Sequence, residues 1–123
     1  QVTLLSSLDQ QDLKDLFGSK SMTLDEYVIS RARKSIESGC DGVIASGHTI
    51  GPVRAALGPG PLIVSPGIRP SGFSCDDHKR ICTPANAIKD GADYLVVGRP
   101  IYAAKAPVNA ALGIIEEIES ALA

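Results

Sequence analysis

LIVSPGIRPSG at residues 62–72 and YLVVGRPIY at residues 94–102 are the two stretches that decide the fold of this chain. In each, a run of β-branched and apolar residues reads as a strand, stops at a glycine near an arginine, and gives way to sequence that favours helix. A parallel strand that ends in this way presents a cation and backbone N–H groups where phosphates bind. Arg69 and Arg99 are therefore predicted to hold a phosphorylated small molecule.

Strand and helix patterns alternate four times along the 123 residues. Strands are expected at 2–5, 42–46, 62–65 and 94–97. Helices are expected at 9–17, 23–39, 49–57, 83–91 and 107–122, with a long loop at 66–81. Because each strand is short and continuously apolar, both of its faces must be buried. This pattern predicts the α/β class, with a parallel sheet covered by helices.

Two of the helix starts carry a specific capping signal. Thr23 is followed three residues later by Glu26, which is the spacing of a capping box. Thr83 is followed directly by Pro84, the favoured order of an N-cap and the first helical residue. These signals predict where the second and fourth helices begin.

Composition limits the classes of partner. The net charge is −2 and the pI is about 5.6, so the chain lacks the basic surface of a nucleic-acid-binding protein or of a polybasic membrane anchor. No apolar run approaches the roughly 20 residues that span a bilayer, and the start QVTLLSS does not have the pattern of a signal peptide. We expect a cytoplasmic protein that binds neither nucleic acid nor membrane, and local cations must hold any anionic ligand.

The cysteines and adjacent carboxylates do not predict a metal site or a disulfide. Cys40, Cys75 and Cys82 are odd in number and lack the spacing of a zinc site, so reduced thiols are expected. Asp76 and Asp77 lie in a loop rich in glycine and serine, where neighbouring carboxylates are usually solvated or cap a helix. We therefore expect no metal.

Three segments, VTLLSSLDQQDL, SPGIRPSGFSCDDHKRICTPANAI and GADYLVVGRPIY, closely resemble the C-terminal half of the bacterial orotidine 5′-phosphate decarboxylase family. SPGIRP, the helix start TPxxA and VVGRPI carry most of the specificity, since their order and spacing match as well as their letters. The resemblance implies a (β/α)₈ TIM barrel, of which residues 1–123 supply strands five to eight. It also implies a lyase of pyrimidine biosynthesis that converts orotidine monophosphate to uridine monophosphate without a cofactor.

The family's catalytic motif, Asp-x-Lys-x-x-Asp, occurs nowhere in these 123 residues. A complete barrel needs about 250 residues. The chain alone is therefore expected to be inactive, and its implied partners are a complementary N-terminal half and, for the intact enzyme, a second copy in a homodimer. A natural half-length protein that pairs with itself is the alternative.

The resemblance assigns the substrate-binding positions to Ser6, Arg69, His78, Gly98 and Arg99. His78 departs from the family pattern, which usually has glutamine there, and a neutral imidazole could supply part of that hydrogen bonding. Gly98 would let its backbone N–H approach the phosphate.

A plainer reading exists for each of these positions. The arginines could pair with carboxylates, Ser6 could cap a helix, and His78 could be an ordinary exposed loop residue. His48 is expected to be structural. Lys79 and Arg80 are expected only to add positive potential to the loop, behind the two main arginines.

Two other functions fit the same residues. One is a different phosphate-binding barrel enzyme, such as a sugar-phosphate decarboxylase that shares the phosphate grip. The other is a non-catalytic half-barrel fragment, which would bind phosphate weakly or not at all.

Overall fold

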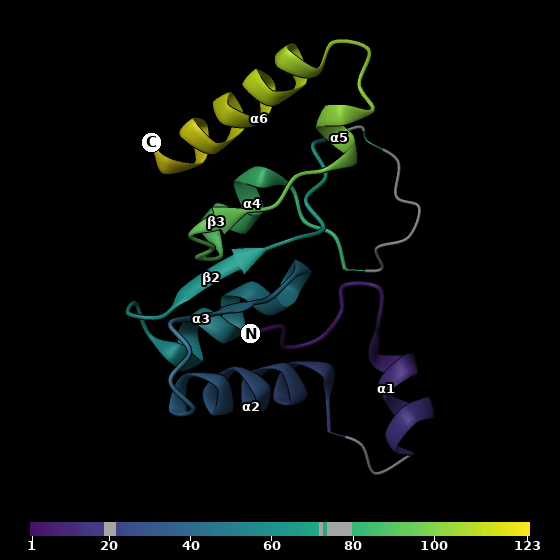
Figure 1. Ribbon diagram of the computed structural model, residues 1–123, viewed down its shortest axis with the longest axis vertical. Helices are drawn as coiled ribbons and strands as arrows, with labels where there is room; N and C mark the ends of the chain where they lie inside the picture. Colours follow the sequence, from purple (N-terminus) through teal and green to yellow (C-terminus); the bar gives the residue numbers. More distant parts are fainter. Residues whose placement is uncertain (19–21, 72, 74–79) are drawn as a thin grey trace.

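The computed structural model describes residues 1–18, 22–71, 73 and 80–123, and its arrangement is shown in Figure 1. The first half contains α1 (Gln10–Phe17), α2 (Leu24–Glu37), β1 (Gly42–Ile44), a 3₁₀ turn at Gly47–Thr49, α3 (Ile50–Leu57) and β2 (Leu62–Ser65). The second half contains α4 (Pro84–Lys89), β3 (Tyr94–Leu95), α5 (Arg99–Tyr102) and α6 (Pro107–Leu122). The α/β class predicted from the sequence is confirmed.

The described strands form one parallel sheet in the order β1-β2-β3. Gly42 lies opposite Leu62, and Val64 lies opposite Tyr94. Because all strands run the same way, their carboxyl ends meet at one edge of the sheet. The segments that follow β2 and β3 therefore lie side by side.

The strand expected at 62–65 is confirmed by β2, whereas the other expected strands are shorter in the structure. The predicted strand at 2–5 is wrong in extent, because it is reduced to a bridge between Val2 and Ile44. The chain then turns, with the Leu8 N–H donating to the Leu5 carbonyl at 3.0 Å. This edge segment has a strand neighbour on one side only, so little holds it extended beyond the bridge. Helix α5 was not predicted.

The capping signals are confirmed. The Glu26 N–H donates to Thr23 Oγ1 at 3.2 Å, and the Thr23 N–H donates to Glu26 Oε2 at 2.8 Å. The hydrogen bond from the Thr23 backbone is the main reason that the pKa of Glu26 is lowered. Thr83 likewise accepts from the Asn86 N–H at the start of α4. These starts depend on residues three apart, so local sequence was sufficient to place them.

The two faces of the sheet differ sharply. Side chains at odd-numbered positions, such as Val43 and Ile63, are buried against a core from α2, α3 and α4. Side chains at even-numbered positions are exposed or half-buried, with 42% of Leu62 and 60% of Tyr94 exposed. Since strand residues alternate between faces, the helices cover one face of this sheet and leave an apolar face uncovered.

Helix α6 lies at one end of the molecule and α1 and α2 lie at the other (Figure 1). α6 packs on α4 and α5, and α2 packs on α3. Within the described part of the chain, no helix has the length and apolar character needed to cross a membrane.

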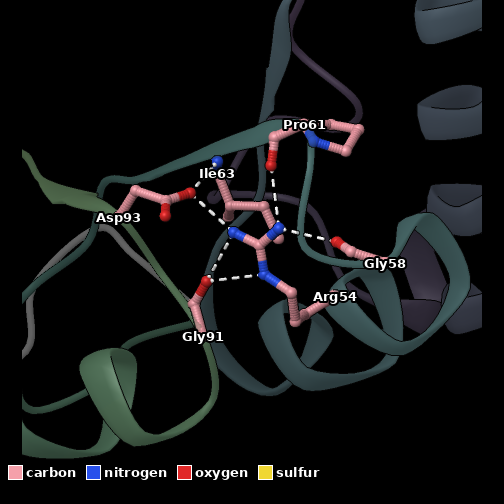
Figure 2. A network of polar contacts seen from close by, with 6 residues as sticks. All are labelled: Arg54, Gly58, Pro61, Ile63, Gly91 and Asp93. Carbon is pink, nitrogen blue, oxygen red and sulfur yellow. Dashed lines mark hydrogen bonds and ion pairs between the residues drawn. The ribbon is translucent and has the colours of Figure 1, made fainter.

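At the amino ends of the strands, Arg54 joins the loop before β2 to the loop before β3 (Figure 2). Its guanidinium donates to three backbone carbonyls at 2.8 to 3.0 Å, those of Gly58, Pro61 and Gly91. It also forms an ion pair of 2.6 Å with Asp93, whose Oδ2 accepts from the Ile63 N–H at 2.7 Å. This network ties the entry of β2 to the entry of β3, opposite the edge where the strands end.

Replacing Arg54 with methionine is expected to lower the free energy of unfolding by about 2 to 3 kcal/mol, because three carbonyls and a carboxylate lose a charged donor. Urea unfolding checks this value. Arg31→Met, which removes an exposed arginine from α2, is the matched control and should change stability by less than about 0.5 kcal/mol. Equal effects of the two variants would contradict the role given to Arg54.

Candidate functional site

A cavity of about 220 Å³ lies where the segments after β2 and β3 meet. Its lining residues are Pro66, Gly67, Arg69, Val96, Gly98, Arg99 and Tyr102. The structure thus brings together Arg69, Gly98 and Arg99, three of the five residues assigned to the site from sequence. They meet because adjacent parallel strands end at the same edge.

The segment after β2 is fixed by backbone contacts near Arg69. Gly67 has a φ of +75°, a left-handed conformation that favours glycine. Ile68 forms a parallel bridge with Cys82, and the Arg69 N–H donates to the Cys82 carbonyl at 2.9 Å. The two ends of the long loop are therefore joined at a narrow neck, and Arg69 is part of it.

The Arg69 side chain is buried, with only 6% of the residue exposed. Its Nη1 donates to the Ile68 carbonyl at 2.8 Å, and its guanidinium carbon lies 5.9 Å from the centre of the Phe73 ring. Among residues 1–18, 22–71, 73 and 80–123, no carboxylate forms an ion pair with it. A buried guanidinium is stabilised by an anionic partner, so Arg69 is suited to contact an anion in the cavity that it lines.

The other side of the cavity is built by the turn from β3 into α5. Gly98 precedes α5, and a Cβ built on it would lie an ordinary 3.5 Å from Tyr102. In the described part of the chain, no protein atom crowds this position. Close approach of a ligand remains the predicted reason for it. Arg99 is half-buried and is the first residue of α5.

The remaining predicted residues lie elsewhere. Ser6 is half-buried in the turn after the first bridge and is not among the residues that line this cavity. Its carbonyl accepts from the Arg80 N–H at 3.3 Å. His78 lies outside the described residues, so its contact with a ligand remains a prediction, as do the expectations for Cys75, Asp76, Asp77 and Lys79.

Arg80 was underrated from the sequence. It was expected to add positive potential to a loop, but only 4% of it is exposed. Its Nη2 donates to the carbonyls of Leu4 and Leu5 at 2.9 and 2.7 Å. Burial lowers its pKa, and the charge of Asp25 opposes this shift. No local pattern distinguishes Arg80 from Lys79 before it, since the acceptors of Arg80 come from the other end of the chain.

Neither histidine nor cysteine chemistry is assembled in the described part of the chain. His48 is exposed, and its Nε2 lies 3.4 Å from Asp25 Oδ1. Its expected structural role stays a prediction. Cys40 and Cys82 are half-buried thiols, and burial is the main cause that raises the pKa of Cys82. Within residues 1–18, 22–71, 73 and 80–123, no cluster of three metal-ligating side chains occurs.

A second cavity, between α1 and α2, is lined by Leu13, Phe17, Met22 and Tyr27. Its volume is also about 220 Å³, but its lining carries no charged group. It therefore offers nothing to hold an anion, unlike the cavity between the two arginines.

Comparison with known proteins gives a consistent result. Residues 1–114 match the family described as "Orotidine 5'-phosphate decarboxylase / HUMPS family". Orotidine 5'-phosphate decarboxylase of Gluconobacter oxydans is 47% identical over 120 residues, which are 98% of this chain and 50% of that protein. The enzyme of Trichlorobacter lovleyi is 50% identical over 117 residues, which are 95% of this chain and 48% of that protein.

Solved structures agree with the sequence comparison. The crystal structure of orotidine 5'-phosphate decarboxylase from Lactobacillus acidophilus matches with a TM-score of 0.75 and 33% identity, over 95% of this chain and 47% of that one. The enzyme from Pyrococcus horikoshii matches with a TM-score of 0.61 and 34% identity, over 78% of this chain and 43% of that one. The chain spans about half the length of the relatives that it matches.

Proposed function

The chain belongs to the orotidine 5′-phosphate decarboxylase / HUMPS family, and we propose that it is the C-terminal half of a (β/α)₈ barrel that converts orotidine 5′-phosphate to uridine 5′-phosphate. It would act in the cytoplasm, in pyrimidine biosynthesis. The observation that carries the proposal is that Arg69 and Arg99 line one cavity at the carboxyl ends of β2 and β3. Barrels of this kind bind phosphate at the loops that follow their last two strands.

In this proposal the chain grips the substrate phosphate. Two guanidinium groups offer forked donors that match phosphate oxygens, and the backbone of Gly98 faces the same space. The phosphate is remote from the bond that breaks, but binding energy from a remote group can still be used to lower the barrier at the reacting centre. The role of these residues is therefore to bind and orient the nucleotide.

The bond-breaking groups would come from the complementary half. By family resemblance, the carboxylates of the Asp-x-Lys-x-x-Asp motif crowd the departing carboxylate, and its lysine protonates the carbanion left at the pyrimidine carbon. That motif is missing from this sequence. The reaction then needs no group on this chain to exchange a proton with the ring.

The uncovered face of the sheet supports a partner half. Four even-numbered residues expose between 42% and 60% of their surface, namely Val2, Leu62, Tyr94 and Val96. On α6, apolar residues at helical spacing are also exposed, from 49% to 71%: Val108, Leu112, Ile115 and Leu122. An apolar face of this extent favours association, and closure of a barrel would bury both surfaces and remove the sheet edges. We propose that the complementary half covers them and that two complete barrels form a homodimer.

The test uses the complete barrel, formed by joining this chain to a complementary half that carries the catalytic motif. We expect it to release carbon dioxide from orotidine 5′-phosphate and to bind uridine 5′-phosphate more tightly than uridine. Turnover of a sugar phosphate with none of the nucleotide would instead support the related phosphate-binding enzymes. Failure to bind any phosphorylated ligand would support the non-catalytic fragment.

A further inference from the structure

Arg80 connects the far end of the long loop to the turn that carries Ser6. Its Nη2 donates to the carbonyls of Leu4 and Leu5, and its backbone N–H donates to the carbonyl of Ser6. Three consecutive carbonyls of the segment that follows the first bridge are thus held by one residue more than seventy positions away. Few single residues constrain a turn so completely.

The same residue borders the neck that holds Arg69. Cys82 follows Arg80 by two positions, its carbonyl accepts from the Arg69 N–H at 2.9 Å, and its N–H donates to the Gly67 carbonyl at 3.3 Å. A short path therefore runs from the Ser6 turn to the backbone of Arg69, through a hydrogen bond to Arg80, the covalent segment 80–82 and a hydrogen bond from Arg69 to Cys82. Movement of Arg80 would change the spacing between these two candidate ligand positions.

The loop that follows β1 also contacts Arg80. Gly47 has a φ of +58°, and a Cβ built on it would lie 3.0 Å from the Arg80 Cβ. The backbone of the loop after β1 therefore packs directly on Arg80, which leaves this residue little room to shift. Arg80 lies where the segments that follow the first bridge, β1 and β2 all meet.

We propose that Arg80 is a positioning residue that fixes Ser6 relative to Arg69 in the nucleotide site. The inference rests on the proposed function. Arg80 does not line the cavity between Arg69 and Arg99, only 4% of it is exposed, and its Nε and Nη1 atoms are buried. Its influence on a bound nucleotide must pass through the residues that it holds.

The contacts of Arg80 predict that lysine can largely replace it. Only Nη2 of its side chain forms hydrogen bonds, whereas Nε and Nη1 have no partner in the described part of the chain. A single ammonium group can donate to two carbonyls. Arg80→Lys is therefore expected to keep most of the function, while Arg80→Met removes it.

In the complete barrel, Arg80→Met is expected to lower kcat/KM for orotidine 5′-phosphate about tenfold, the scale of a small misplacement of binding groups. Arg80→Lys should stay within about threefold of the parent. When Arg80→Met is added to the Ser6→Ala variant, it should have a smaller effect than in the parent protein, because the residue through which Arg80 acts is already changed. Full additivity of the two substitutions would overturn the proposal.

Arg54→Met is the matched control for loss of a half-buried arginine that donates to loop carbonyls at the other end of the strands. It should lower stability but leave kcat/KM within twofold at a temperature where every variant is folded. If Arg80→Met lowers stability as Arg54→Met does but leaves kcat/KM and the affinity for uridine 5′-phosphate unchanged, Arg80 is structural and the inference is wrong.

Amide hydrogen exchange separates this inference from the proposed function, since it needs no ligand. In Arg80→Met, the Leu8 amide, which donates to the Leu5 carbonyl, should exchange at least about tenfold faster relative to the Val96 amide, which donates to the Ser65 carbonyl. In Arg54→Met that ratio should not change. An unchanged ratio in Arg80→Met would exclude the positioning role even if the barrel proved to bind another substrate.

Discussion

Replacing Arg99 with alanine in the complete barrel is expected to lower kcat/KM for orotidine 5′-phosphate by the equivalent of about 2 to 5 kcal/mol, the range for truncating one partner of a buried, hydrogen-bonded charge pair. The loss should appear in the affinity for uridine 5′-phosphate and not in the affinity for uridine, because the phosphate is the group that Arg99 is proposed to bind. Steady-state kinetics and calorimetric titration of the two ligands measure these effects.

The control for Arg99 is Arg31→Ala, which removes an exposed arginine from α2 on the helical side of the sheet. It should leave kcat/KM unchanged, so that a general effect of net charge is excluded. Arg99→Lys should recover part of the loss, since lysine keeps the charge but not the forked pair of donors. A loss below threefold for Arg99→Ala would remove this residue from the phosphate site.

The chain by itself is expected to show no decarboxylation of orotidine 5′-phosphate, because none of its residues supplies the Asp-x-Lys-x-x-Asp motif. Enzymes accelerate reactions by about a millionfold or more, and loss of the reacting groups should return the rate to background. Release of carbon dioxide, followed with and without the complementary half, measures the difference.

Restored turnover on adding the complementary half would show that the isolated chain was competent to assemble. The same mixture made with the Arg99→Ala chain should be slower, which ties the recovered activity to this half. Detectable turnover by the chain alone would instead place the reacting groups within these 123 residues and contradict the assignment of the chemistry to the other half.

Local sequence predicted the parts of this fold that depend on near neighbours. The capping box at Thr23 and the N-cap at Thr83 involve residues three positions apart, and both are present. The meeting of Arg69 and Arg99 was also predictable, because parallel pairing of β2 and β3 follows from two short apolar runs separated by a helix. The length of the first strand was not predictable from local sequence. It depends on a second neighbouring strand, and a segment at the edge of this sheet has only one.

The sequence by itself determined the α/β class, the family resemblance and the two arginines of the candidate phosphate site. Only the tertiary structure decided which other arginines matter. Arg54 and Arg80 are ordinary basic residues in the sequence, but one joins the strand entries and the other holds the turn at Ser6. The reason is physical: the role of a guanidinium group depends on the carbonyls that surround it. These carbonyls come from segments that become neighbours only when the sheet has formed.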